Sequence, residues 1–210
     1  MTDIEIPVDK ARELLSRTAI SVGYSEQLAT QLTDAALWLE RVDARGMHSL
    51  LVYLILTQGL TFEARKPSAG RTYGLKCICP IMAANIIVMK YAKRGLPQGI
   101  VGLEGPAAPV LMAPQLVELA RSNDRSVRLH AYDARLVFGA TGFKFDGPGF
   151  GHFPMVDASG SEPVGVEFIP LVDFPEPPPL TTIRMSKVRV QMSAVLDLQN
   201  RAEAVHSPSA

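Results

Sequence analysis

The spacing of apolar residues changes once along the chain, near Gly95, and this change constrains the fold more than any other feature. Before Gly95, apolar side chains recur every three or four residues, as they do on one face of an amphipathic helix. After it, short runs of alternating or β-branched residues lie between turn residues, as in strands. The sequence therefore predicts an α+β fold, with an N-terminal helical layer packed on a mostly antiparallel C-terminal sheet.

Helices are predicted where an apolar stripe is bounded by capping signals. Ser25 is a suitable N-cap for the second helix, and Gly46 suits the position just after its end. Ser49 could cap the short apolar helix that follows, and Pro80 fits the first turn of the next one. The predicted helices are residues 8–22, 26–45, 50–58, 80–94, 111–122 and 194–205.

Strand-like runs separated by turn residues fill most of the C-terminal half. The predicted strands are residues 98–103, 127–131, 135–138, 164–169 and 188–192, and residues 62–74 are predicted to be an exposed connector. Residues 139–151 contain five glycines and form either a flap over a pocket or an ordinary hairpin loop. We expect one domain over residues 1–210, with a helical part at 6–95, a mixed part at 96–205 and a flexible tail at 206–210.

Charge and composition exclude several classes of protein. The chain has 210 residues, with 21 Lys and Arg against 21 Asp and Glu, so no net charge marks a surface for nucleic acid or anionic lipid. The most apolar stretch, residues 50–56, is far shorter than the roughly 20 residues of a membrane helix. The acidic N-terminus lacks the pattern of a signal peptide, and the chain has two cysteines. These features predict a cytoplasmic protein without nucleic-acid or membrane partners.

Cys79 is the first candidate for a catalytic residue. It directly precedes Pro80 at a predicted helix N-terminus, where free backbone N–H groups favour a thiolate and lower its pKa. The alternative is that Cys77 and Cys79 are both ordinary buried residues, as free cysteines commonly are. Two cysteines this close, with scattered histidines, do not make a metal-ligand set, so no metal is expected and the cofactor is unknown.

His48 and Glu104 are the other two candidates for catalytic residues. His48 lies between two predicted helices, where it could move a proton or simply be a polar residue at a helix start. Glu104 follows a predicted strand and could be a base at a ligand site, or a turn carboxylate facing water. His130 and His152 are predicted to be structural or solvated, on a strand and in a loop respectively.

Several short motifs resemble a bacterial family of unknown function, the domain of unknown function 3726. They are Val-Gly-Tyr-Ser at residues 22–25, Ala-Ala-Leu-Trp-Leu at 35–39, Ile-Cys-Pro-Ile at 78–81 and Gly-Pro at 105–106. The resemblance covers about residues 6–205. It implies a bacterial protein but no activity, and it assigns no catalytic residue.

A narrower segment, residues 19–60, is similar to the N-terminal helices of the type-2 malate/L-lactate dehydrogenases. In that family a helix ends in Arg-Gly and is followed by Ser-His-Gly; this chain keeps Arg45, Gly46 and Ser49. Leu50 stands at the place of the family's histidine, and His48 lies two positions earlier. The proton-transfer role therefore does not transfer to His48, and the resemblance implies distant kinship of one helical layer.

Three hypotheses about function remain open at this point. The first is a small-molecule metabolic enzyme whose pocket lies between helices and sheet and uses Cys79 and His48. The second is a non-enzymatic accessory or binding subunit, and the third is a degenerate relative of the NAD(P)-dependent type-2 dehydrogenases. A small-molecule ligand is expected, and the helix at residues 50–58, apolar nearly all round, predicts a homodimer or a partner enzyme. The side chains expected at the centre of the core are Leu32, Leu39, Leu51, Leu54 and Ile55.

Overall fold

The computed structural model describes residues 5–70, 72–131, 134–146, 163–176, 181–184 and 200. The helices are α1 (Val8–Ser21), α2 (Glu26–Arg41), α3 (Gly46–Thr57), α4 (Phe62–Arg65), α5 (Pro80–Tyr91), the 3-10 helix η1 (Pro109–Met112) and α6 (Ala113–Arg121). The strands are β1 (Glu5–Pro7), β2 (Val101–Glu104), β3 (Arg125–Ala131), β4 (Ala134–Phe138), β5 (Phe143–Asp146), β6 (Pro163–Pro170) and β7 (Thr182–Arg184). The predicted strand at 188–192, the end of the glycine-rich loop and His152 lie outside the described residues, as does the helix at 194–205 apart from Asn200.

Five strands form one antiparallel sheet in the order β2-β6-β3-β4-β5, while β1 and β7 pair separately. On β3, Val127 and Leu129 are fully buried, whereas Arg128 and His130 between and after them are only partly buried. This alternation puts one face of the sheet in the core and leaves the other as an outer face. The predicted α+β class, with its N-terminal helices and C-terminal sheet, is confirmed.

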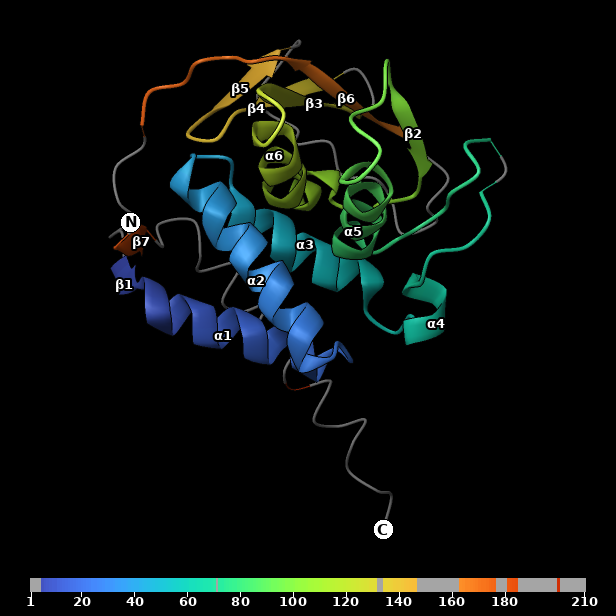
Figure 1. Cartoon of the computed structure of the whole chain (residues 1–210). Coiled ribbons are helices and arrows are strands. Elements are labelled where there is room, and N and C mark those ends of the chain that lie inside the picture. The colour runs from blue at the N-terminus through green and yellow to red at the C-terminus, as the bar shows by residue number, and fades with distance from the viewer. Residues whose placement is uncertain are drawn as a thin grey trace.

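The helices are stacked on the inner face of the sheet (Figure 1). Helix α6 packs directly on β3, with η1 and α5 beside it, and α2 and α3 lie behind them. Helix α1 packs on α2 on the side away from the sheet. The N-terminal helices therefore reach the sheet mainly through α6 and η1, and Trp38 of α2 makes a direct ring contact with Phe138 of β4 at 6.3 Å between centroids.

The junction between α2 and α3 differs from the prediction. Helix α2 ends at Arg41, and Asp43 and Arg45 adopt left-handed backbone conformations before α3 begins at Gly46. A Cβ on Gly46 would collide with the carbonyl oxygen of Ala36 and lie 2.6 Å from the Cβ of Leu39, so this glycine allows α3 to cross α2 closely. Long-range packing, not the end of α2, explains Gly46.

Ser49 does not cap α3. It lies inside the helix, where its Oγ donates a hydrogen bond to the carbonyl oxygen of Arg45 at 3.1 Å. The backbone N–H of Met47 is satisfied instead by Oε1 of Glu40, at 2.7 Å. The first turn of α3 is therefore capped by a carboxylate from α2, which no local sequence pattern indicates.

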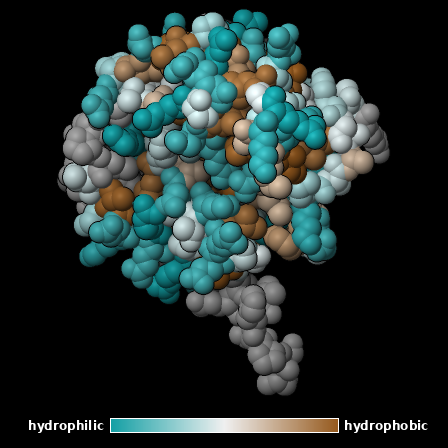
Figure 2. Space-filling model, viewed as in Figure 1, coloured by the Kyte–Doolittle hydropathy of each residue, from teal (hydrophilic) through white to brown (hydrophobic). Residues whose placement is uncertain are grey.

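Four of the five predicted core residues, Leu32, Leu39, Leu51 and Leu54, are at most 2% exposed. Ile55 is 44% exposed, so its predicted burial is wrong: α3 is covered on only part of its surface. On the face shown in Figure 2, hydrophobic residues lie in several separate patches between hydrophilic ones. The large exposed hydrophobic residues of the described chain are Ile20, Ile55, Phe62, Tyr73, Met89, Ile100 and Leu171.

Two further findings complete the description. The segment predicted as a connector contains the one-turn helix α4, and the short strands β1, β5 and β7 were not predicted. None of the helices in the described ranges is long and apolar enough to cross a bilayer.

Candidate functional site

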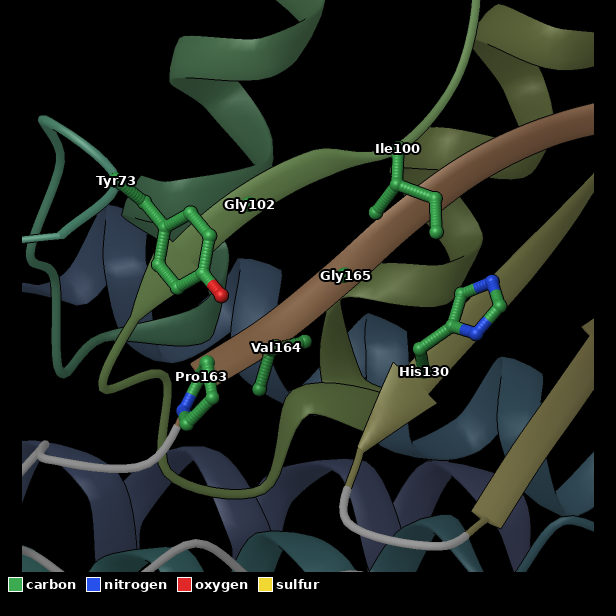
Figure 3. A pocket seen from close by; sticks show the side chains of 7 residues that line it. All are labelled: Tyr73, Ile100, Gly102, His130, Pro163, Val164 and Gly165. Atoms are coloured by element: carbon green, nitrogen blue, oxygen red, sulfur yellow. The ribbon is translucent and has the colours of Figure 1, made fainter.

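A pocket of about 480 Å³ opens on the outer face of the sheet (Figure 3). We call it the outer-face pocket. Its residues come from the segment before α5, the approach to β2, and the strands β2, β3 and β6. They are Tyr73, Ile100, Gly102, His130, Pro163, Val164 and Gly165.

The floor of the pocket is made by two glycines that face each other across strands. Gly102 of β2 pairs with Gly165 of β6, and His130 of β3 pairs with Gly165 on the other side. Opposed residues in a sheet share a face, so these three positions form one row across the outer face. Without side chains at two of the three positions, a molecule can approach the backbone of the sheet directly.

Tyr73 forms one wall of the outer-face pocket. It lies on an arm, residues 68–76, that is closed by two hydrogen bonds between the backbones of Ser68 and Lys76, at 2.8 and 2.9 Å. The ring of Tyr73 covers Gly102, where an added Cβ would lie 2.7 Å from the Cγ and Cε1 atoms of the ring. In Figure 3 the hydroxyl of Tyr73 points along β6 toward Val164.

Glu104 holds this arm. The side chain is only 8% exposed, and its Oε1 accepts hydrogen bonds from the backbone N–H groups of Thr72 and Tyr73, the second at 3.0 Å. The backbone of the arm also runs along β2: the N–H of Glu104 donates to Leu75 and the N–H of Cys77 donates to Glu104, both at 2.9 Å. Glu104 therefore lies at a strand end, as predicted, but its carboxylate binds backbone N–H groups of the arm.

His130 forms the opposite wall and belongs to a charged group. Its Nε2 lies 2.9 Å from Oε2 of Glu167, which also accepts a hydrogen bond from Nη1 of Arg128 at 3.0 Å. The hydrogen bond from His130, together with Arg128, lowers the pKa of Glu167 despite partial burial. In Figure 3 both ring nitrogens of His130 lie on the side of the ring away from Gly165, so the ring presents carbon atoms to the floor.

Cys79 lies elsewhere, inside the core. It is the N-cap of α5, as the position of Pro80 predicts, but its side chain is fully buried. Burial raises the pKa of Cys79, although the backbone N–H groups of Met82 and Ile81 and the hydroxyl of Tyr53 lower it. The predicted fall in this pKa is therefore wrong, because the loss of water outweighs the helix N-terminus. Burial also raises the pKa of Cys77, to about 12.

A buried polar cluster surrounds Cys79. The hydroxyl of Tyr53 is hydrogen-bonded to Cys79, and the hydroxyls of Tyr24 and Tyr53 are hydrogen-bonded to each other. The guanidinium of Arg65 lies over the ring of Tyr24, 4.4 Å from its centroid. Burial raises the pKa of both tyrosines, so they are neutral hydrogen-bonding groups at physiological pH.

Arg65 is the most unusual member of this cluster, since it is charged and only 2% exposed. Its Nη2 donates to the carbonyl oxygens of Val22 and Thr57, each at 3.0 Å. Val22 is the C-cap of α1, and Thr57 is the last residue of α3. Helix C-termini carry unpaired carbonyls and a partial negative charge, so two of them stabilise this buried cation.

The three predicted site residues do not lie together in one pocket of the described chain. Glu104 holds the arm of the outer-face pocket, Cys79 is buried under α4, and His48 is exposed on the first turn of α3. Sequence reasoning missed Tyr73 and the two floor glycines. One signal was present: β2 and β6 share the pattern Val-Gly-x-Glu, at residues 101–104 and 164–167. A glycine inside a strand often marks a close approach to the backbone.

Among the residues that the structure describes, no three His, Cys, Asp or Glu side chains lie close enough together to hold a metal ion. Comparison with family models, curated proteins and solved structures gives no match to this chain.

Proposed function

We propose that this protein binds a small molecule in the outer-face pocket. The observation that carries the proposal is the pairing of Gly102 with Gly165 at the floor, between the walls formed by Tyr73 and His130. Two opposed glycines weaken a sheet, because each loses more conformational entropy on folding than other residues and packs no side chain. A binding site that needs access to the backbone accounts for that loss.

The size and lining of the pocket support a metabolite as the ligand. Its volume of about 480 Å³ falls within the range of small-molecule sites, roughly 300–1,000 Å³. Ile100, Pro163 and Val164 supply apolar surface, and the hydroxyl of Tyr73 supplies a hydrogen-bonding group. Mostly apolar walls with a few polar groups are typical of such sites.

The test is a thermal-shift screen of a metabolite library on the wild-type protein and on Gly165→Val. A Cβ on Gly165 would lie 2.7 Å from Cγ2 of Ile100 and 3.3 Å from Cβ of His130, so valine fills the floor. A compound at a hundred times its Kd stabilises the wild type by about 2.7 kcal/mol, and we expect the variant to lose that shift. Met89→Ala, at a 79% exposed residue outside the pocket, is the control and keeps the shift.

Two outcomes would overturn the proposal. One is a library without any compound that shifts the wild-type melting temperature. The other is a compound that shifts Gly165→Val as much as the wild type, because binding would then lie elsewhere.

An enzyme that uses Cys79 is a second proposal, favoured by the hydrogen bond between Tyr53 and Cys79 at the start of α5. Arg65 also favours the thiolate electrostatically. This proposal requires a conformation that exposes the sulfur, since Cys79 is fully buried and Arg65 beside it is only 2% exposed. Loss of turnover in Cys79→Ala, with an unchanged melting temperature, would support it, and full activity would exclude it.

A further inference from the structure

The charges around the outer-face pocket restrict what it can take, if the pocket binds a small molecule as proposed. None of its lining residues is Asp, Glu, Lys or Arg. The neighbouring charges are Arg128 and Glu167, and they are paired with each other and with His130. A charged ligand would lose its water without gaining an unpaired partner of opposite sign, which is unfavourable. The electrostatics therefore favour an uncharged ligand.

The shape of the floor favours a flat ring. Two opposed glycines leave a smooth strip of backbone, and the protein itself already uses part of this strip for a ring: the side chain of Tyr73 lies on Gly102. The adjacent position, Gly165, is bordered by Ile100 and His130. A second ring placed beside Tyr73 would meet an aromatic edge, an aliphatic side chain and a flat peptide surface, which suit its faces and edges.

The position of Tyr73 depends on Glu104. The arm carrying Tyr73 is closed by the Ser68–Lys76 pair, and the nearly buried carboxylate of Glu104 holds its tip through two consecutive N–H groups. Gly70 lies against the same oxygen, since an added Cβ would be 2.8 Å from Oε1. A charge-assisted pair of hydrogen bonds is about twice as strong as a neutral pair, so this contact fixes the wall of the pocket.

We infer that the outer-face pocket takes an uncharged, flat ring beside Tyr73, and that Glu104 is the positioning residue that keeps Tyr73 in place for it. This inference rests on the proposed function of the same pocket. It narrows the ligand to a class, and it gives the Glu104 carboxylate a role as a structural clamp on the binding wall.

The ligand class is tested with three probes of one shape: benzamide, benzoate and benzylammonium. Binding at millimolar probe concentration is followed by NMR on the wild type, Tyr73→Leu and Met89→Ala. We expect benzamide to bind about tenfold more tightly than either ion, a difference of about 1.4 kcal/mol. Tyr73→Leu should lose most of the benzamide binding, and Met89→Ala should retain it. Equal or tighter binding of benzoate or benzylammonium at the Tyr73-dependent site would overturn the assignment of an uncharged ring.

The role of Glu104 is tested by Glu104→Gln and Glu104→Ala. Glutamine keeps an oxygen that accepts both N–H groups, and alanine removes it, so only Glu104→Ala should speed hydrogen exchange in residues 72–73. We expect benzamide to bind Glu104→Ala roughly three- to tenfold more weakly, because the ligand must then order the wall. In Tyr73→Leu, adding Glu104→Ala should weaken binding no further. Faster exchange throughout the chain, or additive losses in the double variant, would show a general effect on stability and overturn the positioning role.

The outcomes separate the two levels of proposal. If none of the three probes binds but a library compound shifts the wild type and not Gly165→Val, the binding function stands and the ring class is wrong. If no compound of any kind binds, the binding function itself is wrong.

Discussion

Replacing Arg65 with methionine removes the guanidinium that joins the C-terminal ends of α1 and α3 while keeping most of the side-chain volume. The change leaves the carbonyl oxygens of Val22 and Thr57 without the donor that each has at 3.0 Å. A buried polar group that loses its partner costs about 1–3 kcal/mol, so the two carbonyls together contribute about 2–6 kcal/mol. The contact with the Tyr24 ring contributes about 0.5–2 kcal/mol more.

An opposing effect reduces this loss. Nε and Nη1 of Arg65 are buried and have no hydrogen-bond partner among the described residues, and methionine removes the cost of burying them with the charge. We therefore expect Arg65→Met to lower the free energy of unfolding by about 2–4 kcal/mol. Arg65→Lys keeps a charge and a donor, so its loss should be smaller.

Urea denaturation followed by the fluorescence of Trp38, the sole tryptophan, measures this difference. Arg121→Met is the matched control, because Arg121 is an exposed arginine in the last turn of α6, and it should change stability by at most about 0.5 kcal/mol. A loss below about 1 kcal/mol for Arg65→Met would refute the argument. The helix ends would then be stabilised by water or by their own packing.

Three further predictions follow from burial and charge. Neither Cys77 nor Cys79 should react with iodoacetamide near neutral pH in the native protein, because burial raises both pKa values and excludes the reagent; both should react in urea, and peptide mapping that finds native labelling would contradict this. Leu39→Ala should cost about 2–5 kcal/mol in a urea titration, because the side chain is fully buried, and a loss under about 1 kcal/mol would contradict its place in the core. Glu167→Gln should be less stable than the wild type at neutral pH, and the difference should shrink as the pH falls through the lowered pKa of Glu167, below its ordinary 4.5, because the carboxylate must then be protonated in the folded state too; a difference independent of pH would contradict the pairing with His130.

Local signals allowed the sequence to predict most of the helices. Ser25 caps α2, with its Oγ accepting the N–H of Leu28 at 3.4 Å, and Pro80 stands in the first turn of α5. Both effects act within one helical turn, so they are visible in a few neighbouring residues. Gly46 and Glu40 were misjudged because their partners lie in a different helix from the one each was expected to serve.

The outer-face pocket could not be predicted in the same way, because it depends on register. Gly102 and Gly165 are 63 positions apart, and only the antiparallel pairing of β2 with β6 places them opposite each other. A shift of one residue would have sent one glycine to the inner face. Tyr73 reaches the floor through an arm held by Glu104, a contact that has no periodicity to reveal it. The buried Arg65 is hidden for a similar reason: in sequence it is one more basic residue in an apparent connector.

The arm at residues 68–76 also has a consequence for solubility. β2 is an edge strand of the sheet, and a free edge can pair with a strand of another molecule and start aggregation. Here the backbone beyond the tip of the arm takes up the edge at Glu104, through hydrogen bonds with Leu75 and Cys77 at 2.9 Å. The segment that forms the wall of the pocket is thus also the cover of the sheet edge. Substitutions that release the arm should therefore promote edge-to-edge association of the protein as well as weaken binding, which ties the upkeep of this wall to keeping the chain monodisperse.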